Sequence, residues 1–83
     1  MRATREQWET FLAAMRDAAI TVGQEMSVED AIGEPDFDLL ADAKRDWETA
    51  ASLAGAFSEH AEKFCRDQAA SIAAQIEGRE YGE

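Results

Sequence analysis

The 83-residue sequence predicts an all-α protein, and three observations carry that prediction. Apolar residues recur at three- and four-residue steps from Trp8 to Met26, and again from Leu40 to Ile76. The second series contains no Pro and one internal Gly, Gly55. Between the two lies an acidic stretch with the only proline of the chain, Pro35. This periodicity is typical of amphipathic helices, and we expect a hairpin of one short and one long helix in a single domain.

The first helix is predicted over about residues 4–24. Thr4 followed by Gln7 has the form of a capping box, in which each side chain satisfies a backbone N–H at the open end of the helix. Gly23 lies near the expected end and favours termination there. One apolar face then covers about six turns; its members are Trp8, Phe11, Leu12, Met15, Ala18, Ala19 and Val22.

Residues 25–36 are interpreted as an acidic connector. Ser27 with Asp30 could cap a single short turn, and Gly33 would end that turn in a left-handed conformation. The residue before Pro35 is biased away from helical dihedral angles. Asp36 or Asp38 can cap the next helix, whose dipole favours an acid at its amino end.

The long segment from about residue 37 to 77 admits two interpretations. A continuous helix is favoured because Gly55 costs only about 1 kcal/mol in a helix and no Pro, Asn or Asp accompanies it to form a turn. The alternative is a monomeric three-helix bundle that is broken near Gly55, with Ser58 as the cap of the third helix. Residues 78–83 are expected to be a frayed tail.

A continuous second helix would be about 60 Å long and would outrun the first, which is about 33 Å long. The apolar stripe beyond Phe57 would then lack cover from its own chain, and such a patch marks an interface. The economical solution is a two-fold homodimer that forms a dimeric helical bundle. The residues predicted to carry this self-association are Phe57, Phe64, Gln68, Ile72 and Ile76.

Negative charge is concentrated in one part of the chain. The formal net charge is −10, and residues 17–43 contain eight acids and no Lys or Arg. Such a field repels nucleic acid phosphates and attracts basic surfaces, so we expect a basic protein partner and no direct nucleic acid binding. Simple solubility is the plainer explanation of the same charges. The predicted partner-binding patch consists of Glu25, Glu29, Asp30, Glu34, Asp36, Asp38 and Asp42.

Residues that could carry catalysis or bind a metal are sparse. His60 and Cys65 do not share a helical face, so they cannot form a nucleophile pair within one chain. The acids lack the spacing of a calcium loop, and no phosphate loop or dinucleotide motif is present. We therefore expect no enzymatic activity, no cofactor and no metal site, with Cys65 as a small buried residue and His60 at the surface.

Two functional hypotheses follow. In the first, the acidic segment occupies a basic surface of a host protein, as phage-type inhibitors and nucleic-acid mimics do. In the second, the apolar helix face is the working surface of a structural or assembly adaptor. A mean hydropathy of −0.43 and the lack of a long apolar run argue against a membrane span. The polar start of the sequence lacks the apolar stretch of a secretory signal, so we expect a cytoplasmic protein.

Overall fold

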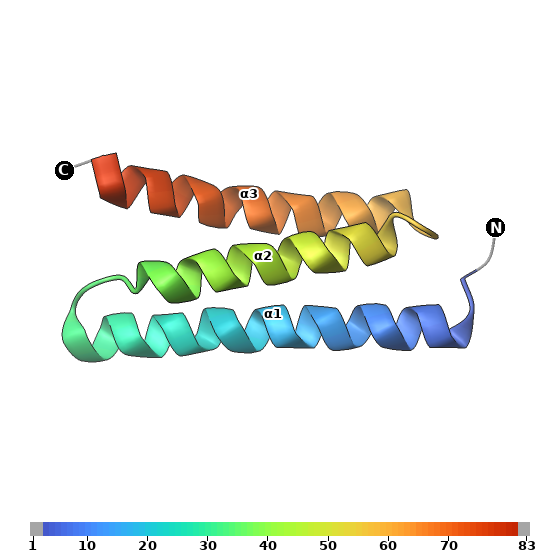
Figure 1. Cartoon of the computed structure of the whole chain (residues 1–83), viewed down its shortest axis with the longest axis horizontal. Helices are drawn as coiled ribbons and strands as arrows, with labels where there is room; N and C mark the ends of the chain where they lie inside the picture. The colour runs from blue at the N-terminus through green and yellow to red at the C-terminus, as the bar shows by residue number, and fades with distance from the viewer. Residues whose placement is uncertain (1–2, 82–83) are drawn as a thin grey trace.

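The computed structural model describes residues 3–81, which form three α-helices and no strand. Helix α1 spans Arg5–Ile32, α2 spans Phe37–Ala54 and α3 spans Glu59–Tyr81. The helices run in alternating directions and lie side by side along most of their length (Figure 1). The predicted all-α class is confirmed for these residues. Within them, no helix combines the length and the apolar character needed to cross a bilayer.

Helix α1 begins as the sequence predicts. The Thr4 hydroxyl accepts a hydrogen bond from the Gln7 N–H at 3.1 Å, and the Gln7 side-chain oxygen accepts from the Thr4 N–H at 2.8 Å. The predicted capping box is therefore present. At the other end, Gly33 adopts a left-handed conformation with φ 75° and donates its N–H to the Glu29 carbonyl, also as predicted.

The predicted end of the first helix near residue 24 is wrong, because α1 continues to Ile32 and the connector shrinks to four residues, 33–36. Glu25 explains the extension. It lies seven and fourteen residues after the buried Ala18 and Phe11, so the helix directs it at α2, and its side chain is only 3% exposed. Its carboxylate accepts a hydrogen bond from the Asp36 N–H at 3.0 Å. This contact requires residue 25 to be helical, and it outweighs the cost of Gly23.

The predicted continuous helix over 37–77 is also wrong, and the three-helix alternative agrees with the structure. The chain reverses over residues 55–58, where the Phe57 and Ser58 N–H groups both donate to the Ala54 carbonyl, at 2.9 and 2.7 Å. The Ser58 hydroxyl then accepts from the Ala61 N–H at 3.1 Å and caps α3. Gly55 keeps right-handed dihedral angles, φ −58° and ψ −21°.

Burial explains why the chain reverses. Folding α3 back on α2 makes the two halves of the apolar stripe face each other, so that Cys65, Ala69 and Ile72 are buried within the chain itself. The reversal also places Phe57 against the rings of Trp8 and Phe11, at centroid distances of 4.7 and 5.9 Å. A single long helix would leave these groups in water, at a cost of about 25 cal/mol for each Å² of apolar surface.

The last helix is longer than predicted. The expected end near residue 77 is passed, and α3 continues through Tyr81. Residues 82–83 of the predicted tail lie outside the described residues.

Helix α2 forms the centre of the molecule and packs against both α1 and α3. Most of its buried side chains are small, which lets its neighbours approach closely: Ala43, Ala50, Ala51 and Ala54 are buried together with Leu40 and Trp47. Among the described residues, α1 and α3 have no Cα atoms within 8 Å of each other. The result is a flat layer of 46 × 22 × 14 Å rather than a closed bundle.

Candidate functional site

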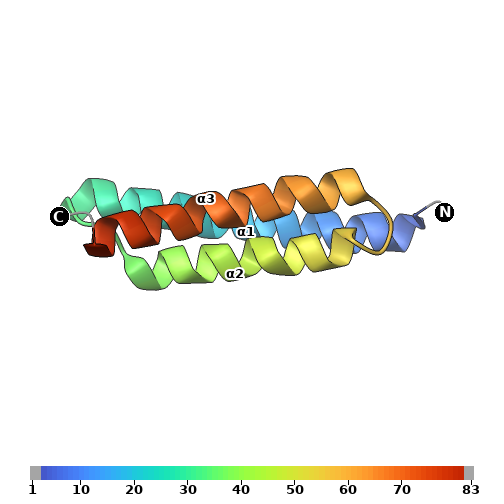
Figure 2. The ribbon, with the colours of Figure 1, turned by 90° about the horizontal axis from the view of Figure 1, so that it is seen from above.

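The three helices are not coplanar. Helix α2 lies between α1 and α3 in Figure 1, whereas in Figure 2 α2 is displaced to one side of the other two, which overlap. The two views together show that α1 and α3 flank the same side of α2. We call the surface between α1 and α3 on that side the trough. At one end it deepens into a groove of about 770 Å³, lined by Val22, Glu25, Met26, Glu29, Asp30, Gly33, Leu40, Ile72 and Gln75.

The α1 wall of the trough is apolar. Val22 and Met26 line the groove, and the residues that precede them at alternating three- and four-residue steps lie on the same side of the helix. The exposed fraction is 41% for Trp8, 56% for Leu12 and 63% for Met26. Large apolar side chains are therefore left in contact with solvent along about 27 Å of helix. The complete series, which we call the α1 wall, is Trp8, Leu12, Met15, Ala19, Val22 and Met26.

The α3 wall has fewer large exposed apolar side chains than the α1 wall, and its residues Phe64, Gln68 and Gln75 are uncharged. Phe64 is 47% exposed and packs edge-to-face on the Trp47 ring, with 6.1 Å between centroids. Gln68 and Gln75 follow at helical spacing, and Gln75 reaches the groove. This wall offers a ring at one end and neutral amides, which can donate and accept hydrogen bonds, toward the other.

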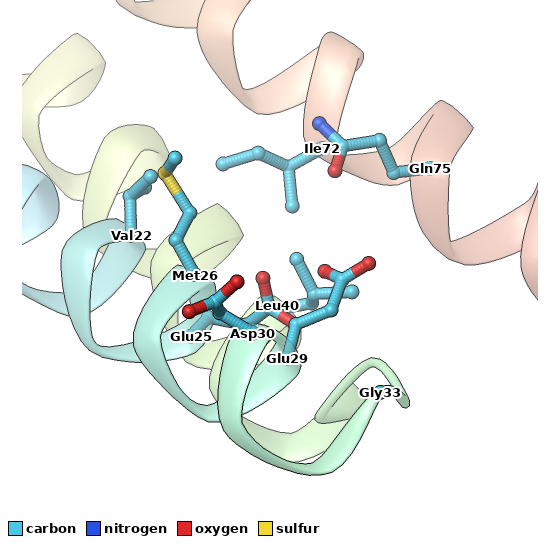
Figure 3. Close-up of a pocket in the computed structure, with 9 residues that line it drawn as sticks. All are labelled: Val22, Glu25, Met26, Glu29, Asp30, Gly33, Leu40, Ile72 and Gln75. Carbon is cyan, nitrogen blue, oxygen red and sulfur yellow. The ribbon is translucent and has the colours of Figure 1, made fainter.

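The two ends of the trough differ chemically. Trp8, Phe11 and Phe57 form a cluster of edge-to-face rings at one end, with centroid separations of 4.7 to 5.9 Å. At the opposite end, Glu29 and Asp30 line the groove from α1, and Gln75 lies across the groove on α3 (Figure 3). We refer to these as the aromatic end and the acidic end.

The predicted acidic patch is divided by the structure. Glu25 and Asp36 hold the α1–α2 connection together: the Glu25 carboxylate binds the Asp36 N–H, and the Asp36 carboxylate accepts from the Leu39 N–H at 3.0 Å. Glu25 is thus a buried structural residue, and the sequence analysis missed this. Only Glu25, Glu29 and Asp30 of the seven line the groove. The exposed acids outside it are Glu34, Asp38 and Asp42.

The predicted self-association residues do not form one open surface. Ile72 is 6% exposed and belongs to the core, and Phe57 packs on Trp8 and Phe11. Ile76 and Gln68 are half-buried. The premise that the stripe beyond Phe57 lacks cover within the chain is therefore wrong for Ile72. Of the five, Phe64 is the one that stays exposed.

The sequence predicted one apolar face for the first helix, but not that part of this face stays exposed. A signal for it exists, because α1 carries two series that each repeat every seven residues and are offset by three. Phe11, Ala18 and Glu25 contact α2, whereas Trp8, Met15 and Val22 form part of the adjacent wall. A helix with two apolar series has more apolar surface than one neighbour can cover.

Groups with catalytic potential do not meet at the trough. Cys65 is buried in the core, and burial raises the pKa of its thiol, so it stays protonated near neutral pH. His60 is exposed, as predicted. Within the described residues, no three His, Cys, Asp or Glu side chains gather closely enough to hold a metal ion.

Comparison of the chain with protein-family models, with curated proteins and with solved structures gives no match.

Proposed function

We propose that the chain is a non-enzymatic protein-binding module whose trough takes an amphipathic, basic segment of a partner protein. The observation that carries the proposal is the α1 wall, where Trp8, Leu12 and Met26 are 41 to 63% exposed in one line beside a groove. Contiguous exposed apolar surface that is rimmed by polar groups is typical of protein interfaces. Aromatic and Met side chains are also enriched at such surfaces.

Apolar contact would supply most of the binding energy. Each of these side chains gains about 1.5 to 3 kcal/mol when a partner removes it from water completely, and less in proportion to the cover it already has. Phe64 on the opposite wall adds a second anchor that is 47% exposed. Rings that are half-covered in the free protein are already held in one orientation, so ordering them on binding costs little entropy.

Charge would supply steering and partner choice. The acidic end lies within residues 17–43, which contain eight acids and no Lys or Arg. Five cations elsewhere are paired with acids of their own helix, from Arg5 with Glu9 to Arg66 with Glu62. The net charge of −10 accelerates association with basic partners at low salt.

A second copy of this chain is the competing occupant. A homodimer through the troughs would cover the α1 walls, and a two-fold axis could keep the acidic ends apart. The net charge of −10 on each copy opposes it. Charge therefore favours a basic partner over self-association through this face.

An inhibitor that mimics nucleic acid is a specific form of the same proposal. The exposed acids Glu34, Asp38 and Asp42 lie outside the groove, around the α1–α2 connection. They would contact a partner surface that normally receives phosphates, while the trough holds an adjacent apolar segment. Competition between this protein and an oligonucleotide for the captured partner tests this form.

The test is a fluorescence-anisotropy titration with a labelled 22-residue helical peptide of Leu, Ala, Gln and Lys. Leu12→Gln changes the α1 wall, and Ile20→Gln is its matched control, because Ile20 is 52% exposed on the same helix but outside the wall series. We expect Leu12→Gln to weaken binding about tenfold and Ile20→Gln to change it less than about twofold. Equal effects of the two substitutions, or no binding by the parent protein, would overturn the proposal.

Sedimentation equilibrium of the free protein distinguishes binding of a partner at the trough from self-association through it. A monomer at 100 μM that binds the peptide one to one supports the proposal. A dimer that Leu12→Gln dissociates would assign the trough to self-association instead. Asp30→Asn removes an acid that lines the groove, and Asp38→Asn removes one outside the groove at the same end. We expect Asp30→Asn to weaken peptide binding more than Asp38→Asn at low salt, and the difference to shrink at high salt.

A further inference from the structure

We infer that the occupant is one α-helix that runs parallel to α2 and antiparallel to α1 and α3, with cationic residues in its amino-terminal third. This inference rests on the proposed protein-binding role of the trough. It adds the secondary structure, direction and charge pattern of the segment that is bound.

The first step concerns shape. In a four-helix bundle each helix packs against two neighbours and lies diagonally opposite the third. Helices α1 and α3 both pack against α2 but have no Cα atoms within 8 Å of each other, which is the relation of a diagonal pair. The empty fourth corner is the trough, and its neighbours are α1 and α3. One helix fills such a corner, because helix axes pack about 8 to 10 Å apart.

The second step concerns the spacing of the α1 wall. From Trp8 to Met26 the wall residues are separated by four, three, four, three and four positions. This alternation is the seam of a helix that packs lengthwise against another helix. The neighbouring series on α1 packs against α2, and its members Phe11, Ala18 and Glu25 are buried. The wall series is a second seam with the same geometry and no helix on it among the described residues.

The third step concerns direction. The acidic end of the trough holds the carboxyl ends of α1 and α3 and the amino end of α2 (Figure 1). A helix carries about half a positive charge at its amino end and half a negative charge at its carboxyl end. Two carboxyl ends against one amino end add negative potential to that of Asp30. An incoming helix is therefore stabilised with its amino end there, which is the antiparallel arrangement with respect to both walls.

The fourth step concerns side chains. Asp30 borders the groove, so a Lys or Arg in the amino-terminal third of the bound helix would meet its carboxylate. The remaining two thirds would lie on Met15, Leu12 and Trp8, where apolar residues are required. A second copy fits this pattern poorly, because the amino-terminal turns of its α1 contain Arg5 already paired with Glu9 at 2.9 Å.

The experiment uses two 22-residue peptides of identical composition that place three Lys residues either in the amino-terminal or in the carboxyl-terminal third. A third peptide of the same composition, scrambled to remove the apolar face, controls for charge alone. Each carries a nitroxide at its amino end, and the amide signals of the isotope-labelled full chain report both binding and direction. Isolated helices disfavour cations at the amino end, so any preference for the first peptide comes from the trough.

We expect the first peptide to bind about fivefold more tightly than the second and far more tightly than the scrambled one. Its nitroxide should broaden the amides around Gly33 and leave those around Trp8 sharp. Equal affinities, or broadening around Trp8, would overturn the direction while binding at the trough stands. Failure of both helical peptides to shift the α1 wall amides would overturn the proposed function as well.

Discussion

The two helix connections of this protein achieve the same reversal by different chemistry. At the acidic end, the α1–α2 connection depends on polar contacts: Gly33 in a left-handed conformation and the buried Glu25 carboxylate on the Asp36 N–H. At the aromatic end, the α2–α3 connection is held by Phe57, whose ring packs on Trp8 and Phe11. One connection is thus set by specific hydrogen bonds and the other by apolar burial.

The two connections differ in whether they can be recognised from the sequence. A left-handed Gly beside Pro35 and a capping Asp is a local signal, and the sequence predicted that connection. The Phe57 connection has no such signal, because Gly55 keeps helical dihedral angles and the ring that holds the turn finds its partners on α1, more than 40 residues away in sequence. The four predictions below test this contrast.

Replacing Phe57 by Ala should give the largest effect. Loss of the ring leaves Trp8 and Phe11 without their neighbour, and we expect the free energy of unfolding to fall by about 3 kcal/mol. Phe64→Ala is the matched control, because Phe64 is 47% exposed and contacts one ring; we expect about 1 kcal/mol. Urea titrations followed by far-UV circular dichroism measure both. A larger loss for Phe64 would contradict the apolar account of this connection.

Replacing Glu25 by Ala should cause the second-largest loss in the free energy of unfolding. The Asp36 N–H loses its acceptor in a buried position, at a cost of about 2 kcal/mol. Glu25→Gln retains a carbonyl oxygen and should cost about 1 kcal/mol, and the adjacent exposed Gln24→Ala should cost nothing measurable. The same urea titrations apply. If Glu25→Ala were as mild as Gln24→Ala, the polar contact would not hold the acidic end.

Replacing the glycine of each connection by alanine compares them directly. Gly33→Ala places a Cβ at φ 75° and should cost about 1 kcal/mol. Gly55→Ala keeps allowed dihedral angles, and its Cβ would meet only the Glu62 carboxylate at 3.2 Å, which is the movable end of a side chain. We expect a change within about 0.5 kcal/mol. Circular dichroism and sedimentation velocity also show whether Gly55→Ala keeps the compact shape; conversion to one long helix would contradict the burial argument.

The thiol of Cys65 reports the core near the aromatic end and should give the smallest effect. Burial raises its pKa in the folded state above the value in the unfolded chain. The stability from keeping the thiol neutral is fully present below the unfolded pKa and is lost as pH rises toward the folded pKa. We expect this group to contribute less stability at pH 9 than at pH 7. Cys65→Ala should remove that part of the pH dependence, and an unchanged pH profile would contradict it.

Much of the helical content, the amino-terminal cap of the first helix and the left-handed conformation of Gly33 were predictable from nearby residues. These caps form through contacts between residues at most four positions apart, so the sequence is enough to predict them; they involve Thr4 with Gln7, Gly33 and Asp36. The extension of α1 past residue 24 was not, because it depends on a hydrogen bond that the Asp36 N–H donates to the Glu25 carboxylate and that forms only when α2 is in place.

The candidate site shows the same division. Concentration of acids in residues 17–43 was evident, but which of them border a groove and which hold the chain together required the packing of α1 on α2. The α1 wall was visible as an apolar series, and its exposure was not, because exposure depends on where α3 lies.

The sequence by itself determined an acidic, all-α chain and its first capping box, since helix periodicity and caps arise from interactions between near neighbours along the chain. Only the tertiary structure decided that the chain reverses at residues 55–58 and that α1 and α3 stay apart across a trough. The physical reason is that burial is a property of surfaces brought together from distant segments, and the same stripe of apolar residues can be covered by its own chain or by another.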